Sequence, residues 1–293
     1  MIDAGTDLER GVRFTYWLPT ASSDDAEAPE VTLSITDADG TVIGDYTSLI
    51  PEDKDDRNGP YLTAKEGLNT FQWPMRLPAG PKMVDTEFHP RPKGPLALPG
   101  TYTATLTVGD ATSSAPVTLV TDPRVTTSAA DFAAQFELLS TIQAKLDEVV
   151  IGVNRIRALR GRLTDWQGRL NAHSDPDTDA ARPDTDAARR DADAAAQAVL
   201  DRIKPIEDAL VQSEFTSGGD TLNYREMLFE KLAALVPVVA SADTAPTKQS
   251  HQVYDKLAGQ IDEQLGALDA VLTDDLDRLN VSLAALDLGI VGA

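Results

Sequence analysis

The hydrophobic residues of this chain follow two different periods. Up to about Pro123, apolar and polar residues alternate, which is the pattern of a β-strand with one buried side. The stretch TYTATLTV, residues 101–108, places four apolar residues on one side and four threonines on the other. Beyond this region the apolar residues recur at steps of three and four, which predicts amphipathic helices.

Further strand patterns fill the first region. The stretch VTLSITDADGTV, residues 31–42, predicts a hairpin whose two-residue turn is Asp39-Gly40. Other strands are expected within GVRFTYWL (11–18), LNTFQWPM (68–75) and APVTLV (115–120). Six or seven short strands in about 120 residues, with no helical stretch between them, predict an antiparallel β-sandwich of immunoglobulin or fibronectin type.

The stretch EGLNTFQWPMRLPAG, residues 66–80, could line a pocket or fill a core. Phe71 and Trp73 lie two positions apart on the same face of the expected strand, so we predict that both point into the space between the sheets. Pro74 fits an edge strand better than a central one. The loop that follows, residues 77–99, holds six prolines, and we interpret this stiffened loop as an interaction surface.

The second region predicts four amphipathic helices. The first is expected to start at Ser128, which forms a capping-box pattern with Asp131, and to run for about 40 residues or roughly 60 Å. Kinks are expected at Pro205 and Pro237. The other helices are expected at about 184–212, 223–240 and 246–280. Four such helices joined by polar loops predict an antiparallel four-helix bundle.

The charge of the chain excludes some partners. Its 47 acidic residues against 26 basic ones give a net charge of −21, which repels phosphate backbones and anionic membrane surfaces. We therefore expect neither nucleic acid nor membrane as a partner. There is no cysteine, which excludes disulfides, thiolate zinc sites, iron–sulfur clusters and a cysteine nucleophile.

The sequence contains no recognisable targeting signal. The first residues, MIDAGTDLER, lack the pattern of a secretory signal, and no stretch approaches 18 consecutive apolar residues. The localisation is left undetermined by the sequence.

Candidate catalytic residues are few. The three histidines, His89, His173 and His251, fall in different expected elements, and no nucleophile elbow, zinc-binding helix motif or phosphate loop accompanies them. Asp37, Asp39 and Asp45 invite a calcium interpretation, but their spacing departs from that of an EF-hand loop and fits turn chemistry better. We therefore predict no catalytic, cofactor-binding or metal-binding residue and no cofactor.

Several phrases together resemble a known family. They are GLNTFQWPMRLP, GPLALPGTYTATLTVGD, TDPRVTTSAADFAAQFELL, VNRIRALRGRL and the long stretch from GGDTLNYREM to DDLDRLN. In this order they are similar to the C-terminal region of large bacterial proteins with sortilin-like (VPS10-type) propellers, which are often labelled BNR-repeat glycosyl hydrolases. The resemblance implies a sandwich followed by helices, without the propeller that precedes them in that family. Pro74 and Pro237 depart from the residues expected there.

The resemblance carries no catalytic residue to this chain, because the hydrolytic residues of the family are expected in the propeller. We expect an immunoglobulin-like β-sandwich at residues 1–123, a four-helix bundle at 124–285 and a tail at 286–293. The predicted function is a non-catalytic accessory module with a protein partner, either a BNR propeller domain or a second copy. As part of a longer precursor it would be extracytoplasmic.

An enzyme remains the alternative. A hydrolase acting on glycans, as the family label implies, would need a pocket lined by carboxylates, for example those of Asp53, Asp55 or Asp56, together with an exposed Trp73. The exposure of Trp73 therefore discriminates between the two hypotheses.

Overall fold

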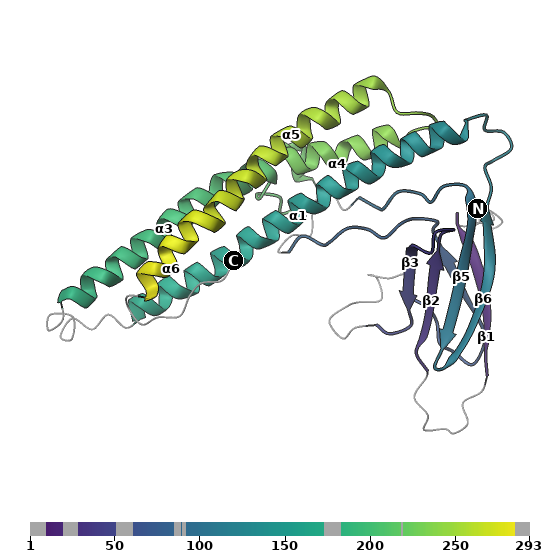
Figure 1. Ribbon diagram of the computed structural model, residues 1–293, viewed down its shortest axis with the longest axis horizontal. Helices are drawn as coiled ribbons and strands as arrows, with labels where there is room; N and C mark the ends of the chain where they lie inside the picture. Colours follow the sequence, from purple (N-terminus) through teal and green to yellow (C-terminus); the bar gives the residue numbers. More distant parts are fainter. Residues whose placement is uncertain are drawn as a thin grey trace. The chain divides into compact units, whose positions relative to one another are not determined.

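The computed structural model describes residues 10–19, 29–50, 61–84, 89, 92–172, 183–217 and 219–284. The fold is mixed α+β, with antiparallel strands followed by helices (Figure 1). The chain divides into two compact units. The strand unit comprises Met1–Ala79, Lys93–Glu137 and Asp243–Ala245, and the helical unit comprises Gly80–Pro92, Leu138–Ala242 and Pro246–Ala293.

The proline-rich stretch 80–92 groups with the helical unit, whereas we expected it to belong with the strands. The described part of this stretch packs within its own chain, and its use as a surface for a partner stays a prediction. The expected domain boundaries at residues 123 and 285 also stay predictions.

The described strands form two antiparallel sheets. One sheet pairs β1 with β4, and the other has the strand order β3-β2-β5-β6. Each strand contains or overlaps a stretch in which alternation predicts a strand, although β6 begins at Ala111 rather than at Ala115. The strands are β1 (Val12–Leu18), β2 (Val31–Thr36), β3 (Val42–Thr47), β4 (Gly67–Trp73), β5 (Gly100–Val108) and β6 (Ala111–Leu119).

The two sheets share one hydrophobic core. Trp73 of β4 is fully buried, and its ring centroid lies 5.9 Å from that of Tyr102 in β5. Phe71 of β4 is also buried, and its ring centroid lies 4.7 Å from that of Tyr46 in β3. These contacts connect one sheet to the other, so the prediction that both aromatic side chains fill a core is confirmed.

The loop between β2 and β3 covers residues 37–41 and is longer than the two-residue turn that we expected. Gly40 adopts a φ of 82°, as the turn prediction required. The carboxylate of Asp37 accepts hydrogen bonds from the backbone N–H groups of Asp39 at 3.0 Å and Thr41 at 2.8 Å. Backbone bonds also close the loop, since the N–H of Asp37 donates to the carbonyl of Thr41 at 3.0 Å and the N–H of Gly40 donates to the carbonyl of Asp37 at 3.2 Å. The tight turn is therefore centred on Ala38 and Asp39, one position earlier than the expected Asp39-Gly40 turn.

Helix α1 begins at the expected capping box. The backbone N–H of Asp131 donates to Ser128 Oγ at 3.2 Å, and this hydroxyl donates to the Asp131 carboxylate at 2.8 Å. The helices are α1 (Ala129–Ala172), α3 (Pro183–Leu210), α4 (Leu228–Val239), α5 (Lys248–Ala270) and α6 (Leu276–Ala284), with a 3-10 turn η2 (Asp220–Leu222) and a π-helical turn η3 (Val271–Asp275).

One helix prediction was wrong in detail. The third helix begins at Leu228 instead of 223, because Met227 is its N-cap in a capping box with Glu230. The last expected helix is present, and a π-helical turn, η3, lies between α5 and α6. Pro205 and Pro237 lie inside α3 and α4, and the kinks expected at them stay predictions.

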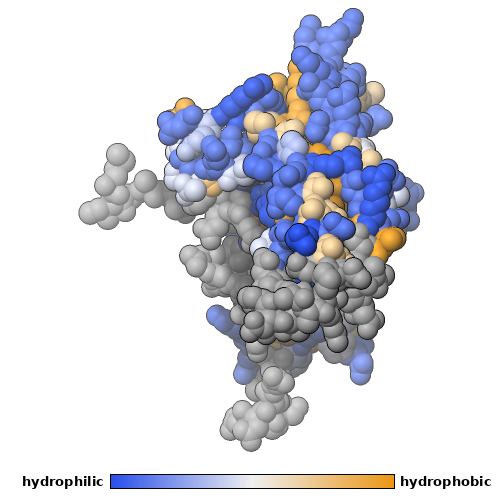
Figure 2. Space-filling model, turned by 90° about the vertical axis from the view of Figure 1, so that its left-hand side faces the viewer, coloured by the Kyte–Doolittle hydropathy of each residue, from blue (hydrophilic) through white to orange (hydrophobic). Residues whose placement is uncertain are grey.

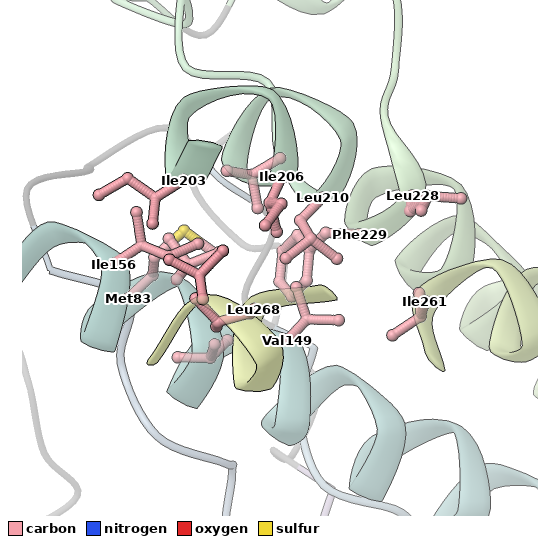
Figure 3. Packing of buried hydrophobic residues seen from close by; sticks show 14 of the residues in the cluster. Met83, Val149, Ile156, Ile203, Ile206, Leu210, Leu228, Phe229, Ile261 and Leu268 are labelled. Carbon is pink, nitrogen blue, oxygen red and sulfur yellow. The ribbon is translucent and has the colours of Figure 1, made fainter. Parts of the chain in front are cut away.

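The helices pack their apolar sides around a second core. Val149 and Ile156 of α1, Ile203 of α3 and Leu268 of α5 are almost fully buried in it, and Figure 3 shows their side chains close together. Met83 of the proline-rich stretch reaches the same cluster with 5 % of its surface exposed. Of the helices that the structure describes, none is both long and apolar enough to cross a bilayer.

The burial of Trp73 predicts a large stability effect. Trp73→Ala should lower the free energy of unfolding by about 3–5 kcal/mol, because it leaves a cavity between the sheets. Trp17→Ala removes a side chain that is 70 % exposed and should change it by less than about 0.5 kcal/mol at low protein concentration. Urea unfolding followed by circular dichroism measures both, and similar losses in the two variants would contradict the described core.

Candidate functional site

Ionisable side chains gather inside the helical unit. Glu207 of α3 and Glu230 of α4 are each only 3 % exposed, and the His89 side chain is 5 % exposed. Arg157 of α1 lies against Glu207, with 10 % of its own side chain exposed. We call these four residues, together with Gln212, the buried polar cluster. Charged groups are rarely buried without partners, so the cluster is the first place to look for function.

Glu207 is held by two arginines of α1. The Nε of Arg157 donates to Glu207 Oε1 at 2.8 Å, and Arg160 donates to the other carboxylate oxygen. The residues stand one helical turn apart on α1, which lets both guanidinium groups reach one carboxylate. These charge-assisted bonds offset the cost of removing the carboxylate from water.

The same face of α1 holds the backbone of residues 82–84. Asn154 Nδ2 donates to the carbonyl of Lys82 at 3.0 Å, and Asn154 Oδ1 accepts from the N–H of Val84 at 2.9 Å. Arg157 also donates to the carbonyl of Val84. We call residues 80–84 and His89 the docked segment, because polar groups of α1 satisfy its backbone while Met83 enters the core.

Glu230 connects the start of α4 to His89. Its carboxylate accepts from the backbone N–H of Met227 at 2.9 Å and from that of Gln212 at 3.3 Å. The Oε1 of Glu230 lies 3.3 Å from the Nε2 of His89. The ring of His89 packs beside Phe215, with centroids 5.5 Å apart. Glu230 thus caps a helix and contacts the docked segment at the same time.

Burial shifts the protonation of this pair. Burial lowers the pKa of His89 from its ordinary value of 6.5, the charge of Arg157 lowers it further, and a hydrogen bond with the backbone of Gln212 opposes both. Burial raises the pKa of Glu230, while its backbone N–H donors partly restore the ionised form and the charge of Glu226 raises the pKa again. A neutral histidine beside a carboxyl group is therefore the favoured state near neutral pH.

A histidine next to a carboxylate can in principle move a proton. A general base must also come within hydrogen-bond reach of the group that it deprotonates, and both side chains here are almost completely covered by the protein. Glu230 accepts hydrogen bonds from the backbone N–H groups of Met227 and Gln212, His89 bonds with the backbone of Gln212, and the two side chains contact each other at 3.3 Å. The arrangement fastens the docked segment to the helices.

The remaining candidate residues are dispersed. His251 is exposed in the first turn of α5, and Asp37 belongs to the β2–β3 loop. His173 lies outside the described residues, as do Asp53, Asp55 and Asp56. Of the two described histidines, the side chain of His89 is buried and His251 is exposed, and Trp73 is buried within the strand core.

Sequence reasoning missed the two buried glutamates. Glu207 follows Ile206 and precedes Leu210 by three positions, so it lies along the apolar side of α3. Glu230 lies between Phe229 and Leu232 near the start of α4. An acid on the apolar side of an amphipathic helix is the signal that could have identified both.

An apolar pocket lies elsewhere in the helical unit. Its lining comes from α1, α3 and α6 and includes Leu163, Trp166, Ala196 and Leu283, with Gln167 as its polar member. Such a lining offers no acid, base or nucleophile. Within the described residues no group of three or more histidine, aspartate or glutamate side chains is placed to hold a metal ion.

Comparisons with protein-family models, with curated proteins and with solved structures found no match.

Replacing the buried Arg157 of α1 should destabilise the fold much more than replacing the half-exposed Arg155 of the same helix. Arg157→Met should lower the free energy of unfolding by about 3–5 kcal/mol, because it leaves Glu207 with one guanidinium and removes the donor to Val84. Arg155→Met removes a half-exposed arginine whose ion pair with Asp269 is 3.5 Å long, and should cost less than about 1 kcal/mol. Chemical unfolding of both variants checks this, and equal costs would contradict the role of the cluster.

The lowered pKa of His89 predicts how the free energy of unfolding depends on pH. The unfolded chain takes up this proton at a higher pH than the folded chain, so His89 destabilises the fold as the pH falls below about 6.5. The stability of the wild type relative to His89→Gln should therefore fall between pH 7 and pH 5, by at most about 1.4 kcal/mol per pH unit.

Glu230 acts in the opposite direction, because a raised folded pKa favours the folded state as the pH falls, but it is present in both proteins. Urea unfolding at several pH values measures the difference. His251→Gln, which removes an exposed histidine, is the matched control. If wild type and His89→Gln lose stability in parallel, His89 does not carry the effect.

Proposed function

We propose that this chain is a non-catalytic accessory module that binds another protein, corresponding to the C-terminal region of a sortilin-like protein with a BNR-repeat propeller. The observation that supports this best is that the buried ionisable groups of the helical unit bind other groups of the protein. The buried carboxylates are bound by arginine side chains and backbone N–H groups, and the neighbouring histidine is covered. Groups used in this way stabilise a scaffold.

We further propose that the strand unit is an immunoglobulin-like β-sandwich and that the helices form an antiparallel four-helix bundle. The first proposal is supported by two antiparallel sheets whose inner aromatic residues contact each other. The second is supported by apolar stripes on α1, α3, α4 and α5 that meet in one core.

The partner that we propose is a protein, either a BNR propeller domain or a second copy of the chain. The net charge of −21 disfavours nucleic acid and anionic membranes. The face drawn in Figure 2 is mainly hydrophilic over its coloured residues, with hydrophobic residues in narrow strips. A hydrophilic surface of this kind is typical of transient or modest protein interfaces. In a longer precursor of the family type the module would be extracytoplasmic.

The alternative, a hydrolase acting on glycans, required an exposed Trp73 beside carboxylates. Trp73 is 0 % exposed, so it cannot form a stacking platform for a sugar. This burial favours the accessory module.

An activity screen tests the proposal. The purified chain should hydrolyse neither chromogenic glycosides nor peptides above the buffer rate. Glu230→Gln, which removes the acid of the buried histidine–carboxylate pair, is the matched control, with its folding verified by circular dichroism. Turnover that persists through purification of the wild type and is lost in Glu230→Gln would overturn the proposal.

The partner is tested separately. Coding DNA on the 5′ side of the Met1 codon should specify propeller repeats. The propeller domain encoded there, produced on its own, should bind this chain in a calorimetric titration. A propeller that gives no binding heat and no co-elution would contradict the proposed docking.

A further inference from the structure

Strand β1 has a free edge in the described part of the chain. It pairs with β4 alone, over all seven residues from Val12 to Leu18. The carbonyl oxygen of Trp73 lies 2.2 Å from where a Cβ on Gly11 would stand, so this carbonyl points toward β1 at the Val12–Trp73 pair. Because backbone groups alternate along an antiparallel strand, those of Arg13, Thr15 and Trp17 point away from β4.

The edge strands of the four-stranded sheet carry features that oppose further pairing. In the four-stranded sheet, β3 contains a register shift next to Val42, and β6 contains Pro116, which has no N–H to donate. Strands β1 and β4 have no such feature within them, and each is followed directly by a proline, Pro19 and Pro74 respectively. Bulges and prolines are the usual means by which natural sheets prevent edge-to-edge association.

Strand β1, with the sequence VRFTYWL, has neither a register shift nor a proline within its seven residues, and Pro19 follows it directly. It contains no proline, no glycine and no lysine, and its register with β4 is continuous. Seven residues of such an edge form a ready template for another strand. A two-stranded sheet is also marginal by itself and gains stability when further strands are added.

The sequence of β1 is complementary to itself in the antiparallel direction. If a two-fold axis passes through Thr15, Arg13 lies opposite Trp17 of the second copy, and Phe14 lies opposite Tyr16. The outer face then carries two arginine–tryptophan pairs, and the inner face carries two aromatic pairs. Both kinds of directly opposite pair stabilise antiparallel strands.

Exposure fits this arrangement. Trp17 is 70 % exposed and its neighbour on β4, Leu68, is 68 % exposed, while Arg13 and Thr15 are also exposed. Arg13, Thr15 and Trp17 therefore have both their backbone groups at the free edge and their side chains on the outer face. A large indole left in water beside an unpaired edge is the kind of anchor that central interface positions use.

We propose that β1 pairs antiparallel with β1 of a second copy, centred on Thr15, and joins two two-stranded sheets into one of order β4-β1-β1-β4. The inference deepens the proposed function, in which a second copy is one of the two partners, and it rests on the edge of β1, not on the family resemblance. The self-repulsion of two chains that each carry a charge of −21 opposes this pairing, so the dimer should strengthen as added salt screens the charge.

Sedimentation over a dilution series from low to high micromolar concentration tests the proposal. The mass of the full chain should rise from 31.4 kDa toward twice that value, and the dimer fraction should increase when the salt concentration is raised. Thr15→Pro removes an edge-facing N–H without removing a bond to β4, and it should leave the chain monomeric. A monomer at every concentration and salt level would overturn the proposal.

Charge variants test the register of the β1–β1 pairing, and they do not require that β1 tolerate a proline. Arg13→Glu alone and Trp17→Lys alone should each weaken the dimer by about tenfold or more, because each removes both arginine–tryptophan pairs. The double variant places Lys opposite Glu at both positions and should recover dimerisation. Exposed residues are changed in each case, and circular dichroism verifies the fold. A double variant no better than the two single variants would overturn the proposal.

Val120→Lys, which changes an exposed residue just after β6, is the matched control and should dimerise like the wild type. The result is separable from the proposed function. A chain that is always monomeric would leave the activity screen and the propeller titration unaffected, whereas hydrolytic activity would leave the dimerisation of β1 unaffected.

Discussion

The burial of the Glu207 carboxylate is the constraint on which the helical unit depends. A carboxylate that is 3 % exposed requires compensating charge, and α1 supplies it with Arg157 and Arg160. Arg157 then has donors left over, and one of them binds the carbonyl of Val84. A side chain placed to satisfy one buried charge therefore also fixes the path of the docked segment.

The rest of the cluster follows from that path. With residues 82–84 held by Asn154 and Arg157, Met83 enters the apolar core and His89 comes against Glu230. Glu230 is at the same time the cap of α4, so the polar groups form a continuous series from α3 through α1 and the docked segment to α4. Each member lowers the cost of burying the next.

Local pattern predicted what local physics controls. The alternation in β4 and β5 and the Ser128–Asp131 pair led to the correct strands and the correct start of α1, because each depends on residues close in sequence. The association of residues 80–92 with the helices could not be read in this way. It depends on Asn154 and Arg157, which lie some seventy positions along the chain from their backbone partners.

The candidate site also depends on contacts between residues far apart in the sequence, which local pattern does not predict. His89 was identifiable as a rare residue type, but its partner Glu230 was one of 47 acidic residues, and only the three-dimensional arrangement distinguishes it. The loop at 37–41 was misjudged for a related reason, since residue type alone does not determine that the turn is centred on Ala38 and Asp39, with the N–H of Gly40 donating to the carbonyl of Asp37.

The two units differ in whether the side chains that could bind a partner are buried or exposed. The helical unit buries Glu207, Glu230 and Arg157 and bonds them to each other or to backbone atoms. The strand unit buries Trp73 but keeps Trp17 in solvent, on a described edge strand that contains neither a bulge nor a proline. Exposed tryptophan surface costs free energy in water unless a partner covers it. A self-complementary edge beside that tryptophan gives the chain a specific way to recover this free energy, and negative charge limits how far association can proceed.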